Sequence, residues 1–159
     1  MGQDDTKHNL LFISKYPEII HEFTDAMKDR DIEIETAING IEAAAKIKKK
    51  NYDIVITGLS LEGYNGEQII TYLNKTAPST VCIIYTTTIS SAQLHFFINE
   101  RNVFRVFLRP VDFRGAFWEA LEEAYEYHAV QVKNEEDTGA RRQEQEKQER
   151  EIEIMDQRM

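Results

Sequence analysis

Residues Tyr52–Gly66 read YDIVITGLSLEGYNG, and this stretch decides the fold of the chain. Its apolar run, Ile54–Ile56, contains no polar residue, which is typical of a central parallel strand that is covered on both faces. Gly58, Gly63 and Gly66 then break the pattern and predict a loop before the next helix. Because functional residues collect beyond the carboxyl ends of the strands in open parallel sheets, we expect the functional site at the end of this strand.

Strand and helix patterns alternate along most of the chain. The predicted strands are Asn9–Ile13, Ile32–Ala37, Asp53–Thr57, Val81–Tyr85 and Val103–Leu108. Their alternation with helices through short connections favours a parallel sheet with helices on both faces. We predict the α/β class and a flavodoxin-like (βα)5 three-layer sandwich. Its parallel five-stranded sheet is expected to have the order 2-1-3-4-5, and a charged C-terminal helical extension follows it.

The predicted helices carry recognisable start signals. Pro17 suits the first turn of the first helix. Ser90 or Ser91 is expected to cap the fourth helix, and Asp112 to cap the long last helix. On the fourth helix, the residues expected to face the sheet are Leu94, Phe97 and Ile98.

The composition excludes several classes of protein. A net charge of −9 and an isoelectric point near 5.0 argue against a nucleic-acid partner, which needs clustered cations. The single cysteine, Cys82, excludes an internal disulfide framework. The polar start of the chain lacks a secretory signal, and no apolar run reaches membrane-spanning length. We therefore expect a cytoplasmic protein with no membrane partner.

Three sequence motifs occur in the right order and at the right spacing for a known family. Residues Asp53–Gly66 match in part the pattern D-[hydrophobic]3-x-D and then P-G-x-D-G, with the first aspartate, the apolar run and both later glycines in register. The second aspartate of the pattern falls on Gly58, its proline on Glu62 and its last aspartate on Asn65. Thr36–Ala43 is similar to A-x-[ND]-G-x-E-A, and Asn102–Asp112 is similar to I-Y-R-F-L-T-K-P-W-D. Together they resemble the receiver domain of two-component response regulators.

The resemblance covers roughly Asn9–Val130 and implies a module of bacterial phosphorelay signalling. Its implied partners are a signalling kinase or an output domain. In the receiver subgroup that the third motif resembles, a coiled coil and an enzymatic output domain often follow the receiver.

The resemblance also implies a phosphorylation site at five positions of this sequence. The acidic pair that binds Mg²⁺ falls on Ser14 and Lys15, and the phosphoacceptor aspartate falls on Gly58. The hydroxyl falls on Thr86, which is retained, and the lysine falls on Arg109. Because a glycine offers no nucleophile, we predict a degenerate pseudo-receiver with a vestigial phosphorylation site, no catalytic residue and no bound Mg²⁺.

The lost metal site leaves a cation in the cleft. We predict that Lys15 pairs there with Glu62, which follows in the loop after the central strand. The four histidines are scattered, and Cys82 lies within a strand, so neither a zinc site nor a catalytic dyad is expected. The protein is therefore not expected to be an enzyme.

Three parts are expected along the chain: residues 1–8 as a disordered segment, 9–131 as the receiver-like domain and 132–159 as a charged tail. The tail from Asn134 has nine acidic and five basic residues and few apolar ones, so it cannot bury a core alone. Two interpretations stay open. The tail is a frayed helix or disordered segment, or it begins a coiled coil with Ile152, Met155 and Met159 along the seam.

The expected function is a phosphorylation-independent module for protein interaction and dimerisation. Phe96, Trp118 and Tyr125 fall outside the predicted core stripes and are candidates for the centre of a homodimer interface, unless they cover the edge of their own monomer. The alternative function is an anion or nucleotide-phosphate sensor, because Lys15 and Arg109 are expected to face the cleft.

Overall fold

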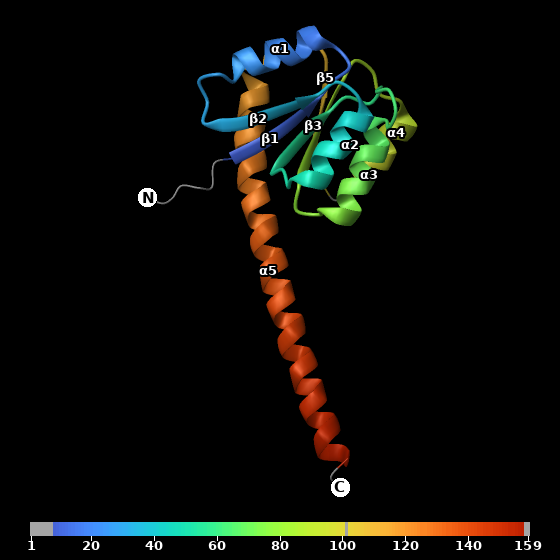
Figure 1. The fold of residues 1–159 in the computed structure, drawn as a ribbon, viewed down its shortest axis with the longest axis vertical. Helices are drawn as coiled ribbons and strands as arrows, with labels where there is room; N and C mark the ends of the chain where they lie inside the picture. The colour runs from blue at the N-terminus through green and yellow to red at the C-terminus, as the bar shows by residue number, and fades with distance from the viewer. Residues whose placement is uncertain (1–7, 101, 158–159) are drawn as a thin grey trace. The chain divides into compact units, whose positions relative to one another are not determined.

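The computed structural model describes residues 8–100 and 102–157, and the side chains of 8–100 and 102–136. Strands and helices alternate along the chain (Figure 1). The strands are β1 (His8–Ile13), β2 (Ile32–Ala37), β3 (Ile54–Thr57), β4 (Val81–Thr86) and β5 (Val103–Leu108). The helices are α1 (Pro17–Ala26), α2 (Gly40–Lys49), α3 (Gly66–Thr76), α4 (Ser91–Ile98) and α5 (Ala116–Gln157).

All strand pairs are parallel, and the order β2-β1-β3-β4-β5 confirms the predicted flavodoxin-like sheet. The first strand begins at His8, which the sequence had assigned to the N-terminal segment. The rest of that predicted segment, residues 1–7, lies outside the described residues.

The core forms two layers because successive strand residues point to opposite faces of the sheet. Leu10 and Phe12 face α1 and the first turns of α5, whereas Leu11 and Ile13 face α2, α3 and α4. Aromatic rings fill the first layer, and Phe12 stacks on Phe23 at a centroid distance of 4.2 Å. Both faces of the central strands are therefore buried, as their uninterrupted apolar runs predict.

Helix starts follow the predicted signals at two of the three sites. Pro17 begins α1, and Ser90 caps α4 by accepting a hydrogen bond from the backbone of Gln93. Asp112 does not cap α5 as predicted. Its carboxylate accepts from the backbone N–H of Arg114 at 3.0 Å and closes a turn that precedes the helix.

The inner face of α4 differs from the prediction. Only Phe97 is buried, whereas Leu94 and Ile98 are 41% and 72% exposed. These two residues are four positions apart and share one face of the helix, which is turned away from the sheet. A helix of eight residues can turn only one narrow face toward the core. When most of its residues are apolar, some of the apolar side chains must therefore remain exposed to solvent.

The chain divides into two compact units, residues 1–128 and 129–159, and α5 contributes to both. The predicted helical extension is present as far as Gln157. The side chains of Ile152, Met155 and Met159 lie outside the described residues, so the coiled-coil interpretation stays a prediction. In the described ranges no helix is long and apolar enough to cross a membrane.

Candidate functional site

A small cleft lies at the carboxyl end of the sheet, where the sequence predicts the functional site. Its volume is about 40 Å³. All five positions of the predicted vestigial phosphorylation site line it, together with tyrosines and further loop residues. The full lining is Ser14, Lys15, Tyr16, Gly58, Leu59, Ser60, Leu61, Tyr85, Thr86, Thr87 and Arg109.

The parallel sheet brings these residues together, because strands that run in one direction end at one edge. Backbone hydrogen bonds continue just beyond the strand ends. The N–H of Gly58 donates to the carbonyl of Ile13 at 3.1 Å, and the N–H of Arg109 donates to the carbonyl of Thr86 at 2.8 Å. The loop positions that form the cleft are therefore held by the ladder itself.

Two cations define the charge of the cleft. The Lys15 ammonium group donates to the Ser60 hydroxyl at 3.2 Å and lies 5.3 Å from the centroid of the Tyr16 ring. The Arg109 guanidinium lies 4.9 Å from the Tyr16 centroid and 5.9 Å from the Tyr85 centroid. Aromatic ring faces attract cations, so the two tyrosine rings partly take the role that carboxylates have in ordinary ion pairs.

The predicted ion pair between Lys15 and Glu62 is not formed. Glu62 is exposed and is not among the residues that line the cleft. Its carbonyl accepts a hydrogen bond from the N–H of Gly40 at 2.9 Å, which holds this part of the loop against the start of α2. The prediction rested on the position of Glu62 in the loop that follows β3, which could reach the cleft. The loop instead places Glu62 next to the start of α2.

The hydroxyl groups of Thr86 and Ser14 take part in local hydrogen bonds at the cleft. The Thr86 hydroxyl donates to the carbonyl of Thr88 at 3.1 Å, and the Ser14 hydroxyl accepts from the N–H of Tyr16 at 3.2 Å. Burial raises the pKa of the Tyr85 phenol, and the nearby Arg109 partly opposes that rise. Tyr85 therefore stays a neutral phenol at physiological pH.

The lining does not fit Mg²⁺. This ion takes hard oxygen ligands, above all carboxylates, and it repels cations. Within the described residues, no aspartate or glutamate lines the cleft, while Lys15 and Arg109 both do. No group of three His, Cys, Asp or Glu side chains placed to hold a metal ion occurs in that part of the chain.

Three glycines near the cleft differ in what their backbones require. A Cβ on Gly40 would lie 1.8 Å from the carbonyl oxygen of Tyr64, and one on Gly66 would lie 2.3 Å from that of Gly58. A Cβ on Gly58 would meet its nearest atom, the carbonyl oxygen of Tyr85, at 3.6 Å, an ordinary contact. The first two positions need glycine, whereas Gly58 has room for a side chain.

The sequence analysis missed the two tyrosines that hold the cations. Tyr16 directly follows Lys15, and Tyr85 directly precedes Thr86. In the sequence, only their adjacency to site positions pointed to these tyrosines. Arg109, which lies over both rings, follows β5 and is far from Tyr16 along the chain. Only the fold places Arg109 against both rings.

Of the three interface candidates, one is buried in the monomer core and a second is half-buried against it. Tyr125 is 8% exposed, and its hydroxyl donates to the carbonyl of Asn9 at 3.0 Å. Trp118 is half-buried, and the Arg30 guanidinium lies 4.1 Å from its ring centroid. Tyr125 therefore covers its own monomer, whereas the half-buried Trp118 packs against the core and its place in an interface stays a prediction.

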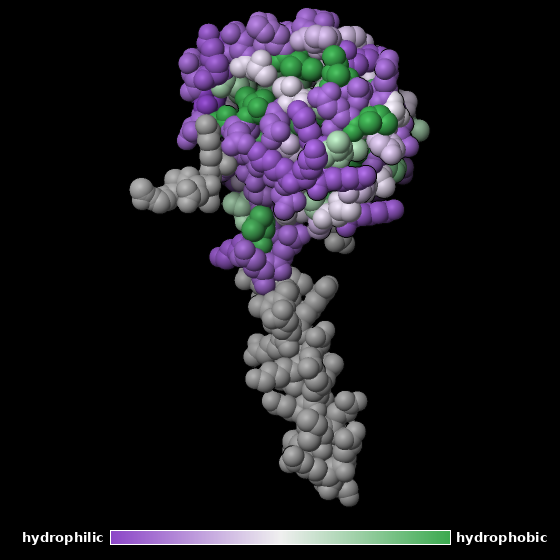
Figure 2. Space-filling model, viewed as in Figure 1, coloured by the Kyte–Doolittle hydropathy of each residue, from purple (hydrophilic) through white to green (hydrophobic). Residues whose placement is uncertain are grey.

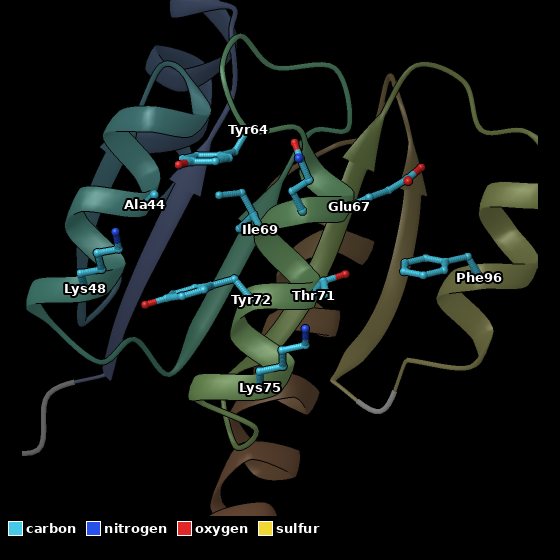
Figure 3. A pocket seen from close by; sticks show the side chains of 10 residues that line it. Ala44, Lys48, Tyr64, Glu67, Ile69, Thr71, Tyr72, Lys75 and Phe96 are labelled. Atoms are coloured by element: carbon cyan, nitrogen blue, oxygen red, sulfur yellow. The ribbon is translucent and has the colours of Figure 1, made fainter.

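Phe96 is the one candidate that stays exposed, at 38%. It lines a broad hollow of about 510 Å³ along α3 (Figure 3). Tyr64 and Tyr72 lie on the α2 side of this hollow, and Phe96 lies on the α4 side. Figure 2 shows the hydrophobic surface of the viewed face as separate patches within hydrophilic surroundings.

Comparisons with known proteins agree with this geometry. No curated protein matches the chain. Among solved structures, an adenylate cyclase from Rhodopirellula baltica is 19% identical, with a TM-score of 0.75 over 84% of this chain and 98% of that one. A CheY-like response regulator receiver domain protein from Methanospirillum hungatei JF-1 is 18% identical, with a TM-score of 0.72 over 79% and 99%.

A third structure is a response regulator from Thermotoga maritima in complex with Mg²⁺–BeF. It is 21% identical, with a TM-score of 0.63 over 74% of this chain and 98% of that one. Likeness at these identities shows the fold. The family itself comes from residues 11–114, which match the response regulator receiver domain over most of the chain. The chain therefore belongs to the response regulator receiver domain family of two-component signalling.

Proposed function

We propose that this domain is a pseudo-receiver, which takes part in two-component signalling through protein contacts and is not phosphorylated in its cleft. One observation carries the proposal: in the described part of the chain, the cleft contains two cations and no carboxylate. A receiver needs a carboxylate as the nucleophile and an acidic metal site to neutralise the incoming phosphoryl group. The described cleft has neither, so the proposed domain acts without Mg²⁺ and without catalysis of its own. Its proposed location is the cytoplasm, as for other two-component signalling modules.

The readout of phosphorylation is missing as well. The aromatic residue whose rotation usually reports phosphorylation in this family corresponds to Val106 on β5. Val106 packs against the core layer beneath α4 and has no ring to rotate. The pseudo-receiver is therefore fixed in one conformation or is switched by something other than phosphorylation.

Intact-mass measurement after treatment with acetyl phosphate and Mg²⁺ tests the proposal. The wild type is expected to gain no phosphoryl mass. The double variant Gly58→Asp/Lys15→Asp is expected to gain one, because position 58 has room for a side chain and Lys15 is exposed. The matched control, Gly58→Asn/Lys15→Asp, has the same size without the nucleophile. A hydroxylamine-labile phosphoryl group on the wild type would overturn the pseudo-receiver assignment.

The protein contacts are proposed to use the surface of α4 and β5. Its exposed apolar side chains are Leu94, Phe96, Ile98 and Leu108. Leu108 and Val106 are two positions apart on β5 and so share the sheet face that α4 covers. In receivers this face commonly forms dimers, and exposed apolar clusters of this kind mark interfaces. We infer a homodimer through this face, with a kinase or output domain as the heterologous partner.

Sedimentation at micromolar concentration tests the dimer. Ile98→Glu is expected to yield monomer, because a charge would be buried without a partner in the interface. Ile41→Glu, at a similarly exposed apolar position on α2, is the matched control and is expected to leave the dimer intact. A monomeric wild type, or an Ile98→Glu dimer of unchanged affinity, would remove this face from the proposal.

A second candidate function is anion sensing in the cleft. In the described part of the chain, neither Lys15 nor Arg109 pairs with a carboxylate, although the protein has a net charge of −9. The volume of about 40 Å³ corresponds to roughly three water molecules. That space suits a phosphate-sized oxyanion and is too small for a nucleoside, so any nucleoside part would lie outside the cleft. The anion would supply the negative charge that Lys15 and Arg109 lack.

A further inference from the structure

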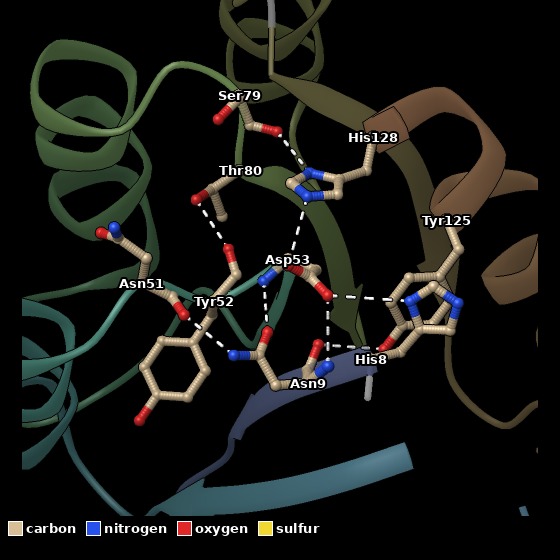
Figure 4. Close-up of polar contacts among 9 residues, drawn as sticks. All are labelled: His8, Asn9, Asn51, Tyr52, Asp53, Ser79, Thr80, Tyr125 and His128. Carbon is tan, nitrogen blue, oxygen red and sulfur yellow. Dashed lines mark hydrogen bonds and ion pairs between the residues drawn. The ribbon is translucent and has the colours of Figure 1, made fainter. Parts of the chain in front are cut away.

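A second charged cluster lies at the amino end of the sheet, opposite to the cleft (Figure 4). Its centre is the carboxylate of Asp53, the residue before β3. One oxygen lies 3.1 Å from the Nε2 of His128, and the other accepts from the N–H of Asn9 at 3.2 Å. The Nδ1 of His8 lies 3.8 Å from that second oxygen.

The ring of His128 lies between two acceptors. Its Nε2 faces the Asp53 carboxylate at 3.1 Å, and its Nδ1 faces the carbonyl oxygen of Ser79 at 2.9 Å. Carboxylate and carbonyl oxygens only accept hydrogen bonds, so both ring nitrogens must donate to satisfy this geometry. A histidine that donates from both nitrogens is an imidazolium cation.

We propose that His128 is a proton-operated staple, which ties α5 to the amino edge of the sheet only while its ring carries both protons. The cation joins three segments: its own helix, the residue that precedes β3 and the connection between α3 and β4. His128 is also the last residue of the first compact unit. The contacts that form the staple all lie within that unit.

Loss of one proton must break one of the two bonds. The neutral ring either turns a lone pair toward the Asp53 carboxylate or turns one toward the carbonyl of Ser79. Both arrangements oppose like partial charges. His128 and Asp53 have side-chain exposures of only 17% and 28%, so solvent screens the lost bond weakly.

The groups that surround His128 set the direction of the switch. β1 contributes His8, the start of β3 contributes Asp53, and the α3–β4 connection contributes the neutral carbonyl of Ser79. On α5 itself, Tyr125 stacks on His8 at a centroid distance of 4.2 Å. Burial raises the pKa of the Tyr125 phenol, so this group stays neutral. Among the contacts of the described residues, the Asp53 carboxylate is an anion that faces the His128 ring.

The sign of the pH dependence follows from the protonated form. Histidine in an unfolded chain titrates near pH 6.5. The staple stabilises the fold fully below that pH, and its contribution disappears as the pH rises through the titration of His128 in the folded protein. We therefore expect the attachment of α5 to weaken on the alkaline side.

Nitrogen-detected NMR of the histidine rings in the full-length chain tests the charge directly. His128 is expected to keep the imidazolium pattern above pH 6.5, the value typical of histidine in an unfolded chain. If His128 is already neutral at pH 6, the proposal is wrong. This measurement uses the wild type and does not depend on whether a variant folds.

The variant His128→Gln tests the attachment. Between pH 6 and pH 8.5, the wild type is expected to lose about 2–4 °C of Tm more than this variant. Amide exchange over residues 125–128, corrected for intrinsic rates, is expected to rise roughly tenfold more in the wild type over the same range. His95→Gln, at an exposed position, serves as the control and should follow the wild type. Equal pH profiles for His128→Gln and the wild type would overturn the proposal.

Discussion

The two ends of the sheet treat charge in opposite ways. At the amino end, Asp53 lies against His128, and each charge has a partner of the other sign. At the carboxyl end, Lys15 and Arg109 have one sign and lie against aromatic rings. Matched charges between segments serve the fold, since a broken pair would be costly. The two cations of the cleft repel each other and do not stabilise the fold in this way. They occupy positions that correspond to the phosphorylation site of the family.

Near the cleft, Gly40 and Gly66 are required by close backbone contacts, whereas Gly58, at the position of the phosphoacceptor, is not. Gly40→Ala is expected to lower the free energy of unfolding by about 3 kcal/mol, because the new Cβ overlaps the backbone of Tyr64. Gly58→Ala is expected to change it by only about 0.5 kcal/mol. Urea unfolding of both variants measures the difference. Equal losses would mean that Gly58 is also a structural requirement and would weaken the comparison.

At the amino end, acid unfolding measures how much the matched pair contributes. Burial of Asp53 opposes its ionisation, but hydrogen bonds from His128 and Asn9 outweigh burial and hold its pKa below the ordinary value. A lowered pKa stabilises the fold at neutral pH, and this contribution is lost as the pH falls through the folded-state value.

Asp53→Asn is therefore expected to cost roughly 1–3 kcal/mol at pH 7 and to lose less further stability on acidification than the wild type does. Denaturant unfolding between pH 7 and pH 3 gives both quantities. Asp29→Asn, at an exposed aspartate, controls for the change in net charge. Parallel curves for Asp53→Asn and the wild type would show that Asp53 is not the stabilising partner at this end.

At the carboxyl end, a phosphate-binding measurement tests whether Lys15 and Arg109 form an anion-binding site. Arg109→Gln is expected to weaken the binding of inorganic phosphate about tenfold, because a charged hydrogen-bond donor is lost. Calorimetric titration compares it with Lys48→Gln, an exposed lysine on α2 that carries the same change in charge. If the wild type binds no phosphate, or if both variants bind equally, the cleft is only a remnant and the anion-sensing candidate fails.

The smallest effect is expected at the outer member of the amino-end cluster. The His8 ring lies 3.8 Å from the Asp53 carboxylate and its side chain is 56% exposed, so solvent screens the interaction. His8→Ala is expected to cost no more than about 0.5 kcal/mol by urea unfolding. A loss as large as that of Asp53→Asn would move the centre of the cluster from His128 to His8.

Local pattern was sufficient for the elements of the sheet. The strands β2 and β5 have the predicted bounds, and the other three differ by one residue at an end. Apolar runs and turn residues act within a few positions, so they are readable in sequence. Asp112 misled the prediction of a helix start, because an aspartate can close a turn as well as cap a helix.

Contacts between distant segments were not readable in the same way. Tyr125 falls outside the apolar stripe predicted for the last helix. It is nevertheless buried, because α5 packs beside β1 and the Tyr125 hydroxyl donates to the carbonyl of Asn9. His128 was one of four scattered histidines until the fold placed Asp53 and Ser79 on either side of its ring. In both cases the partner is more than forty residues away in the chain.

The sequence by itself determined the parallel α/β fold and its strand order, which follow from periodicity and from the rules for crossover connections. The five site positions came from the resemblance of its motifs to receiver domains, and the rule that parallel strands end at one edge explains why these positions meet at the cleft. Only the tertiary structure decided what those residues do there. It turned Glu62 toward α2, placed tyrosine rings against the cations and left space beside Gly58. Side-chain partners depend on how loops and helices pack in three dimensions, and spacing along one chain does not encode that packing directly.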